Sequence, residues 1–430
     1  MRIYESNDIK AVWDRLNRKP LLQQSITGKV REIIAAVSKK GDLALFDYAK
    51  RFDGFELNAQ NIRVTKREID EAYTLVPDEL IDTIKKSARN IAAFHQPQKR
   101  RGYELKEGGA LTGRLVLPMR RAGVYVPGGK AAYPSSVLMN IIPAKIAGVK
   151  EVIMVTPPRK TGVVEPLTLI AADIAGADSI LKIGGAQAIA ALAYGTDSVP
   201  MADIITGPGN AYVTAAKREV FGKVGIDMLA GPSEVLIIAD ETANPVYVAA
   251  DLLSQAEHDE MAASVLLTPC KELARKTALE INRRLDSLPR RDIAKQSIDN
   301  FGTIVVTESV DEAFEISNAY APEHLEIIVR EPAKQLSKVA NAGAVFLGSY
   351  SPETLGDYFA GTNHVLPTSG TARFSSPLSA DSFTKTVNYV YYDKESLEKC
   401  RGDIERFARA EGLFAHAQSV SARFDMEEIL

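Results

Sequence analysis

Histidine is scarce in this chain, with five among 430 residues, and one histidine lies three positions after an amide. These two residues are Gln255 and His258, within the stretch Asp251–Asp259. Residues three apart share one face of a helix, so an amide oxygen and an imidazole would point the same way. Zinc takes imidazole nitrogen and carboxylate oxygen, and an amide oxygen is a rarer ligand that adds no charge. The pair predicts half of a metal site, although an ordinary pair on a helix surface has the same spacing.

A neighbouring carboxyl and imidazole, Glu323 and His324, lie immediately before the apolar run Leu325–Val329. This position predicts that they stand at the entrance to a strand. Together they supply two proton-transfer groups of different pKa, which suits a reaction that moves protons twice. A polar pair at the surface end of a helix is the alternative interpretation.

Two further stretches place acids and histidines near glycine. Asp357 lies in a predicted loop between two glycines, which lets the backbone bring its carboxylate to a shared point, although glycine and aspartate also favour plain turns. In the C-terminal segment, Glu411 and His416 flank Gly412. A glycine inside a helical pattern costs about 1 kcal/mol relative to alanine, which indicates a close approach or a break there. A surface histidine with satisfied hydrogen bonds is the alternative for His416.

Two glycine-rich loops, Ile183–Ala188 and Thr206–Asn210, each follow a predicted strand and open a helix. In an open α/β sheet, ligands bind at the carboxyl ends of strands, and helix N-termini attract phosphate. A nucleotide would fit such a place. However, the chain contains no G-x-G-x-x-G, so the usual dinucleotide fingerprint is missing and the loops alone predict only an anion or nucleotide site.

The elements that must position these residues are strands alternating with amphipathic helices from Leu111 onward, after a first hundred residues that read as helical. Alternation of this kind is typical of βαβ units and parallel sheets, and the number of strands is high for one domain. We therefore expect an α/β fold with two mainly parallel sheets, and a helical segment again at Lys394–Val420. The predicted strands are Val124–Val126, Val152–Val155, Ile180–Ile183, Ile204–Thr206, Val235–Ile238, Val265–Thr268, Thr303–Val306, Leu325–Val329 and Ala344–Leu347.

The bulk composition narrows the class of protein. A chain of 430 residues, with 46% hydrophobic and 25% charged residues, is that of a soluble globular protein with two or more domains. The net charge of −3 and the lack of a long basic run argue against nucleic acid as a partner, and no apolar run has the length of a membrane span. The two cysteines form no disulfide framework, which fits a reducing cytoplasm.

Taken together and in order, these stretches resemble the L-histidinol dehydrogenase family over nearly the whole chain. Seven long blocks in register make this resemblance far more specific than any single glycine pair. The blocks that carry the resemblance are Gly123–Gly129, Gly184–Leu192, Gly207–Val213, Ile226–Asp240 running on to Leu253–His258, Ala321–Glu326, Gly361–Pro367 and Thr371–Ser376.

The resemblance implies a role for each matching residue. It implies one Zn²⁺ per subunit, a general base at His324 and a residue that activates water at Glu323. The implied zinc ligands, which also contact the substrate, are Gln255, His258, Asp357 and His416. The implied contacts to NAD are Tyr125, Gln187 and Asn210, and the remaining implied contacts to histidinol are Ser233, Glu411 and His324. No role follows for His95 or His364, apart from support of Asp357 by the latter.

The resemblance also implies the reaction and the assembly. The expected reaction oxidises L-histidinol to L-histidine in two NAD-dependent steps, in the cytoplasm, within a homodimer in which the C-terminal segment reaches the partner's active site. The expected organisation is an incomplete Rossmann-like α/β arrangement: an N-terminal helical segment 1–20, a discontinuous domain 21–129 plus 235–380, an inserted NAD-binding domain 130–234, and a helical dimerisation segment 381–430.

Other interpretations of the same residues stay open. A related zinc- and NAD-dependent dehydrogenase could oxidise another small alcohol, and the same ligands could serve a zinc hydrolase or a structural metal site. A mechanism through a cysteine thiohemiacetal would need Cys270 or Cys400, of which Cys270 ends an apolar strand like a small buried hydrophobe.

Overall fold

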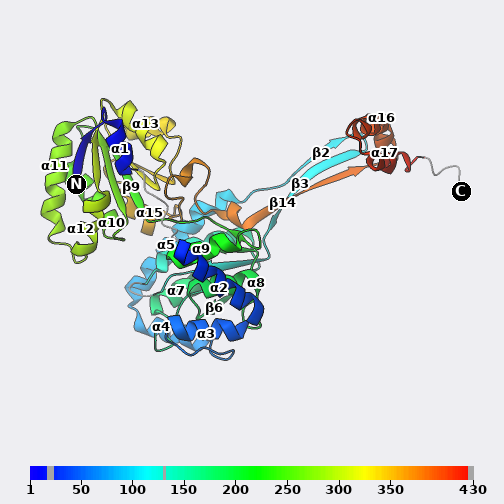
Figure 1. Ribbon diagram of the computed structural model, residues 1–430, viewed down its shortest axis with the longest axis horizontal. Coiled ribbons are helices and arrows are strands. Elements are labelled where there is room, and N and C mark those ends of the chain that lie inside the picture. The colour runs from blue at the N-terminus through cyan, green and yellow to red at the C-terminus, as the bar shows by residue number, and fades with distance from the viewer. Residues whose placement is uncertain (17–23, 129–131, 425–430) are drawn as a thin grey trace. The chain divides into compact units, whose positions relative to one another are not determined.

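A computed structural model describes residues 1–16, 24–128 and 132–424 of the chain (Figure 1). It has two compact units, each made of two separate stretches of sequence. The first unit consists of Met1–Lys99 and Met119–Phe383, and the second of Arg100–Pro118 and the chain from Thr384 onward. No helix among the described residues is both long and apolar enough to cross a membrane.

A six-stranded parallel sheet in the first unit has the order β1-β11-β10-β9-β12-β13. Its central strands are buried along their whole length, as expected for a parallel sheet covered by helices on both faces. The strands are β1 (Arg2–Glu5), β9 (Glu234–Ala239), β10 (Ala263–Thr268), β11 (Thr303–Val306), β12 (His324–Ile328) and β13 (Ala344–Leu347). The helices of this region are α1 (Ile9–Leu16), α10 (Pro245–Ala256), α11 (Lys271–Leu285), α12 (Arg291–Phe301), α13 (Val310–Tyr320), α14 (Pro332–Gln335) and α15 (Glu353–Tyr358).

A five-stranded parallel sheet has the order β6-β5-β4-β7-β8. These strands are β4 (Arg121–Tyr125), β5 (Glu151–Val155), β6 (Ser179–Leu181), β7 (Ile204–Thr206) and β8 (Gly225–Ile226). The helices of this region are α2 (Gln24–Lys40), α3 (Asp42–Phe52), α4 (Lys66–Leu75), α5 (Asp78–His95), α6 (Pro134–Ala147), α7 (Pro166–Ala175), α8 (Gly185–Tyr194) and α9 (Ala211–Val220). A capping box starts α4, where Thr65 and Glu68 satisfy each other's backbone amides.

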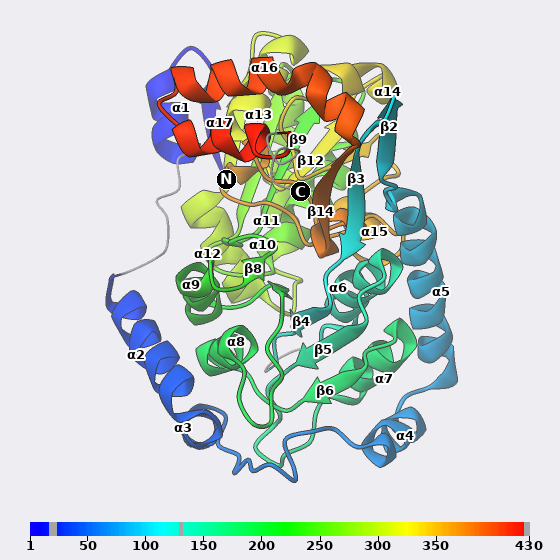
Figure 2. The same ribbon diagram turned by 90° about the vertical axis from the view of Figure 1, so that its right-hand side faces the viewer.

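Alternate residues of β5 enter two different cores. Val152 and Met154 pack with α5, α6 and α7, whereas Ile153 and Val155 pack with α2 and α8. Successive side chains of a strand point to opposite faces, so this split puts one group of helices on each face of the sheet, as Figure 2 shows. The helices thereby fix where the loops at the strand ends lie.

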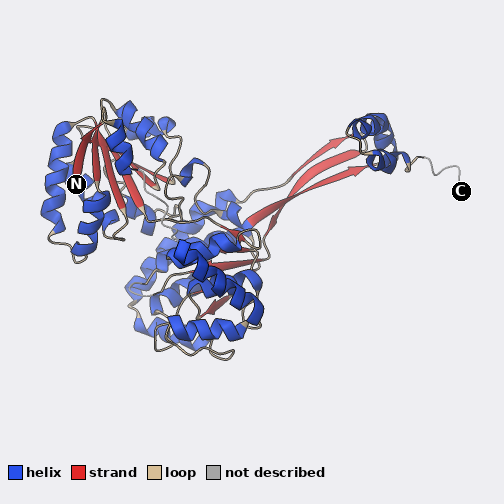
Figure 3. Cartoon of the chain, in the orientation of Figure 1, coloured by secondary structure: helices blue, strands red, loops and turns tan. Residues whose placement is uncertain are grey.

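The second unit combines an antiparallel sheet with two helices (Figure 3). Its strands are β2 (Tyr103–Glu107), β3 (Ala110–Pro118) and β14 (Thr384–Tyr392), with β3 in the middle. The helices are α16 (Lys394–Ala410) and α17 (Phe414–Ser421), and Gly412 at a φ of +76° lies in the break between them. The break expected at Gly412 is thus confirmed. Short 3-10 turns elsewhere in the chain are η1 (Gln96–Gln98), η2 (Leu336–Lys338), η3 (Thr371–Arg373) and η4 (Ala380–Phe383).

The predicted α/β class with two mainly parallel sheets is confirmed, and each of the nine predicted strands is present. The antiparallel sheet was not expected. The N-terminal segment is not wholly helical, because Arg2–Glu5 pairs with β11, and the C-terminal segment begins with β14. These strands are mostly exposed, so they lack the apolar runs by which the buried strands were recognised. The predicted domain boundaries stay a prediction, and the boundary between 129 and 130 lies outside the described residues.

Candidate active site

Strands β9 and β12 lie side by side and bring Glu323 and His324 next to Glu234, at the start of both strands. The predicted position of His324 at a strand entrance is therefore confirmed. The His324 ring donates from Nδ1 to the backbone oxygen of Glu234 at 3.1 Å, which leaves Nε2 as the nitrogen that accepts a proton. Nε2 is buried and has no partner among the described residues. Burial lowers the pKa of His324 to about 4, so the ring is neutral near pH 7.

The Glu323 carboxylate is held by the same backbone. Its Oε2 accepts from the amide of Glu234 at 2.9 Å and lies 3.7 Å from Nδ1 of His324. The Glu234 side chain is itself buried and accepts from the Tyr320 hydroxyl at 2.9 Å and from the Ser369 amide at 3.0 Å. Glu234 was missed by the sequence analysis, because an acid at the edge of an apolar run carries no signal of burial.

Potential metal ligands converge beside this pair. One ligand atom each from His258, Glu353 and Asp357 lies within 4.8 Å of the others. Gln255 is fully buried in α10. When its side-chain nitrogen is turned toward Glu353, that nitrogen lies 3.2 Å from both carboxylate oxygens. This orientation turns the amide oxygen, the atom that would bind a metal, away from the carboxylate. Gln255 lies in the last turn of α10, whereas His258 lies in the turn after the helix end at Ala256, so the two do not share a helix face as predicted. They still contribute to a donor cluster of nitrogen and oxygen atoms, which suits zinc.

Two details of this cluster differ from the sequence prediction. Asp357 lies in the short helix α15 and not in a loop, and Glu353 at the first turn of that helix was not foreseen. An acid in a first helical turn is ordinary, since it complements the helix dipole, so Glu353 gave no separate signal. Burial raises the pKa of Glu353 well above its usual value, and the charges of Asp357 and Glu323 raise it further.

His364 supports Asp357. Its Nδ1 lies 3.6 Å from Oδ1 of Asp357, and its Nε2 lies 3.4 Å from the Ser136 hydroxyl on α6. Burial alone would raise the pKa of Asp357, but the neighbouring histidines, His364 first and then His324 and His258, outweigh burial and lower it. Asp357 is therefore an ionised carboxylate at neutral pH.

The predicted nucleotide contacts lie at the carboxyl ends of β4, β6 and β7, the edge where α/β sheets bind ligands. Tyr125 ends β4, and its hydroxyl accepts from the Gly185 amide at 3.2 Å. Gln187 is 1% exposed, and neither its amide oxygen nor its amide nitrogen has a partner among the described residues. Asn210 is exposed and caps α9 by accepting from the amide of Val213. Unsatisfied buried amides are rare, so Gln187 indicates a polar ligand.

The Gly207 turn has a support that the sequence did not reveal. The Gly207 amide donates to Asp227 at 2.8 Å, and its carbonyl accepts from Lys217 at 3.0 Å. Lys217 and Asp227 form an ion pair whose side chains are 3% and 1% exposed. Gly207 has a φ of +111°, and a Cβ there would lie 2.0 Å from the Tyr125 carbonyl oxygen, so only glycine fits.

The remaining predicted residues are Ser233 in the first unit and Glu411 and His416 in the second. Ser233 is half-buried directly before β9. Glu411 and His416 are exposed residues of the second unit, so their part in the site stays a prediction. Cys270, expected to be a small buried hydrophobe, is half-buried, and its sulfur caps α11 by accepting from the Leu273 amide at 3.4 Å.

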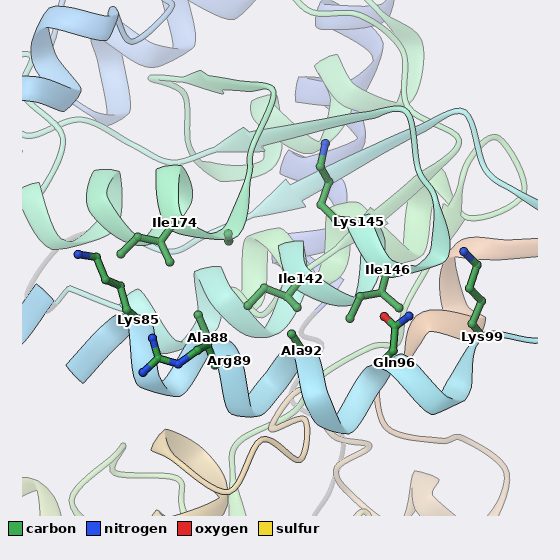
Figure 4. A pocket seen from close by; sticks show the side chains of 11 residues that line it. Lys85, Ala88, Arg89, Ala92, Gln96, Lys99, Ile142, Lys145, Ile146 and Ile174 are labelled. Carbon is green, nitrogen blue, oxygen red and sulfur yellow. The ribbon is translucent and has the colours of Figure 1, made fainter. Parts of the chain in front are cut away.

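A hollow on the surface of α5, α6 and α7 lies apart from the predicted residues (Figure 4). Its floor is formed by small and branched apolar side chains, and its rim carries Lys85, Arg89, Lys99 and Lys145. None of the predicted site residues lines it. This hollow has no part in the candidate active site.

A model of the histidinol dehydrogenase family matches residues 16–424. A histidinol dehydrogenase from Bacillus cereus is 51% identical over 409 residues, which cover 95% of each chain. One from Halalkalibacterium halodurans is 50% identical over 99% of this chain and 100% of its own. The crystal structure of histidinol dehydrogenase from Elizabethkingia anophelis, 40% identical, matches with a TM-score of 0.94 over 99% of this chain and 98% of its own. The chain belongs to the histidinol dehydrogenase family and is an oxidoreductase.

Proposed function

We propose that this protein oxidises L-histidinol to L-histidine through the aldehyde, using two NAD and one water, as the last steps of histidine biosynthesis in the cytoplasm. The observation that carries the proposal is the buried, neutral His324, whose Nε2 has no partner among the described residues and whose ring lies beside Glu323 and Glu353. The relatives described above bear the name of this activity.

His324 would act as the base in both oxidations. Its Nδ1 hydrogen is committed to the Glu234 carbonyl, so Nε2 is the atom that would take the hydroxyl proton as hydride leaves. Its lowered pKa keeps Nε2 free of a proton at neutral pH. The same atom would accept a second proton from the hydrated aldehyde. The Glu234 backbone holds the ring still through both steps.

Glu323 would activate the water that adds to the aldehyde. One of its oxygens accepts a hydrogen bond from the Glu234 amide, which orients the carboxylate. Because Glu323 and His324 lie side by side, both side chains can act at the same reacting carbon of the substrate. No cysteine is needed for this sequence of steps.

Gln255, His258 and Asp357 would hold a single Zn²⁺ in each subunit, with His416 completing the set. The donors fit zinc, since they offer an imidazole, an ionised carboxylate and an amide oxygen. When bound, zinc supplies a Lewis acid that fixes the imidazole and amino nitrogens of the substrate. Ser233 and Glu411 are the further proposed contacts to histidinol.

NAD would bind at the carboxyl edge of the five-stranded sheet, against Tyr125, Gln187 and Asn210. The unsatisfied Gln187 amide supports this site, because a ligand with donors and acceptors would satisfy both of its polar atoms. The Gly185 turn opens α8, which has no side-chain cap, so its N-terminal amides favour a pyrophosphate.

The active form is proposed to be a homodimer in which the second unit completes the partner's site. The second unit is small and leaves large apolar side chains open to solvent, including Val390 at 73% and Phe407 at 71%. Apolar surface of this kind is typical of a protein–protein contact.

The deciding experiment counts NADH formed per L-histidinol consumed, with and without a metal chelator. Two NADH per substrate, lost on chelation and restored by zinc, is the expected result. One NADH per substrate would mean a simple alcohol dehydrogenase and would remove the water step assigned to Glu323. No NADH at all would favour another alcohol substrate or a zinc hydrolase.

A further inference from the structure

His95, at the end of α5, is a fully buried histidine to which no role has been assigned so far. Its Nδ1 lies 2.7 Å from the amide oxygen of Gln98, and its Nε2 lies 3.3 Å from the amide nitrogen of Asn363. The ring therefore bridges α5 and the segment that carries His364.

The direction of these hydrogen bonds is determined by backbone amides at both ends. The oxygen of Asn363 accepts from the Val365 amide at 2.9 Å, so its nitrogen must face His95 and also donates to the Met139 carbonyl at 2.8 Å. The oxygen of Gln98 accepts from the Ala380 amide at 3.1 Å, so it can only accept from His95. His95 is therefore the neutral form that donates from Nδ1 and accepts at Nε2. Burial lowers the pKa of His95 and favours the same form.

The same face of α5 holds the chain between Asp357 and His364. The Ser87 hydroxyl donates to the Tyr358 carbonyl at 2.7 Å, and the Asn90 amide donates to the Phe359 carbonyl at 2.8 Å. Gly361 has a φ of +92° and lies so close to α5 that a Cβ would be 2.4 Å from the Asn90 carbonyl oxygen. Three residues along α5 therefore hold the short segment 358–363, and His95 is the last of the three.

We propose that His95 is a positioning residue of the metal site, which holds Asn363 and thereby sets the places of His364 and Asp357. The proposal rests on the proposed function for the identity of the metal, zinc, but not for the contacts themselves. Loss of the contact between His95 and Asn363 would free the C-terminal end of the segment 358–363. Partners that orient a metal ligand in this way are typically worth 10- to 100-fold in metal affinity or activity.

Two substitutions separate this role from simple packing. In His95→Gln the side-chain oxygen can reach the place of Nε2 and accept from Asn363, whereas in His95→Asn the shorter amide can donate only toward Gln98. Both variants lose the ring, so both should lower the melting temperature of the metal-free protein. Only His95→Asn should weaken zinc binding in chelator competition, by about 10- to 100-fold, with a matching fall in kcat/KM for histidinol. Wild-type zinc affinity in His95→Asn, or equal losses in the two variants, would overturn the proposal.

Hydrogen exchange on the metal-free protein tests the contact without zinc or substrate. The amides of residues 361–366 should exchange faster in His95→Asn than in the wild type and His95→Gln. Unchanged exchange in His95→Asn would overturn the positioning role even if zinc binding fell. If the wild type binds no zinc, the proposal of zinc at this site is wrong. The exchange rates would still decide whether His95 holds the segment.

Discussion

At the residue scale, one backbone unit aligns both proposed proton-transfer groups. The carbonyl of Glu234 accepts from His324, and the amide of Glu234 donates to Glu323. Consecutive side chains in a strand ordinarily point to opposite faces of the sheet. At the start of β12, however, Glu323 and His324 both contact the backbone of Glu234 and so lie on the same side. The arrangement depends on the main chain of β9, so its geometry survives changes in many surrounding side chains.

Glu323→Gln should separate the two oxidations. The amide oxygen still accepts from Glu234, but it cannot take a proton from water, so the second oxidation should slow by about 100- to 10,000-fold. A single-turnover reaction should then yield one rapid NADH per site and a slow second one.

His324→Ala should slow both oxidations by a similar factor, and its circular dichroism spectrum should show a normal fold. Near-normal rates in either variant would remove the roles assigned here.

His324 should also make stability depend on pH. Its pKa is about 4 in the folded protein and about 6.5 unfolded, so the unfolded chain binds more protons between these values. Its contribution is complete above pH 6.5 and is lost as pH falls toward 4. From pH 7 to pH 5, the metal-free wild type should lose about 2 kcal/mol relative to His324→Gln. Denaturant unfolding of both proteins at both pH values measures this difference, and an equal pH response would contradict the assignment.

Single residues were predictable where spacing carried information. Gln255 and His258 were identified by their three-residue spacing, although α10 ends at Ala256 and His258 follows it, and the Glu323–His324 pair was identified by its place before an apolar run. Glu234, Glu353 and the Lys217–Asp227 ion pair were not, because each looks like an ordinary charged residue until distant segments bury it. Burial of a charge is a tertiary property, which local patterns do not contain.

At the element scale, the buried parallel strands were the easiest to predict. Their apolar runs are continuous because helices cover both faces, and β7, β11 and β13 match the predicted bounds. The strands β2 and β14 alternate charged, aromatic and branched residues on an exposed surface, and β1 is a short edge strand. Such strands are defined by their pairing partners, so sequence patterns alone did not reveal them.

The β7–α9 turn should tolerate no side chain at Gly207. In Gly207→Ala the new Cβ would meet the Tyr125 carbonyl, so the turn must move and NAD affinity should fall at least about tenfold. Gly222 is the matched control, since it also has a positive φ of +96° but no atom within 4 Å of a Cβ. Gly222→Ala should lose only about 1–2 kcal/mol of stability and bind NAD normally. Calorimetric titration with NAD measures both, and equal affinities would contradict the importance of this turn.

At the scale of the whole molecule, the proposed donors are divided between two compact units. Gln255, His258 and Asp357 belong to the first unit, and Glu411 and His416 to the second. Two units joined in this way allow one chain to supply ligands to another. The exposed apolar side chains of the second unit are consistent with such a partner.

Mixed dimers test the shared site. His324→Ala and His416→Ala should each be inactive, but a dimer of one protomer of each kind would contain one intact site. Random pairing in coexpressed protein should therefore restore about a quarter of wild-type activity. Light scattering should give the mass of a dimer for all three preparations. Dimers without any recovered activity would mean that each site uses its own chain's His416.

The strands of the antiparallel sheet in the second unit are translated at widely separated times. The paired residues Arg114 of β3 and Asn388 of β14 are 274 positions apart. At about 5–20 residues per second, the newly made β2–β3 hairpin waits roughly 15–50 seconds on the ribosome for its third strand. An isolated hairpin is marginally stable in water, and its open edge can pair with other chains. While the rest of the chain is being translated, this hairpin is therefore a natural target for chaperones.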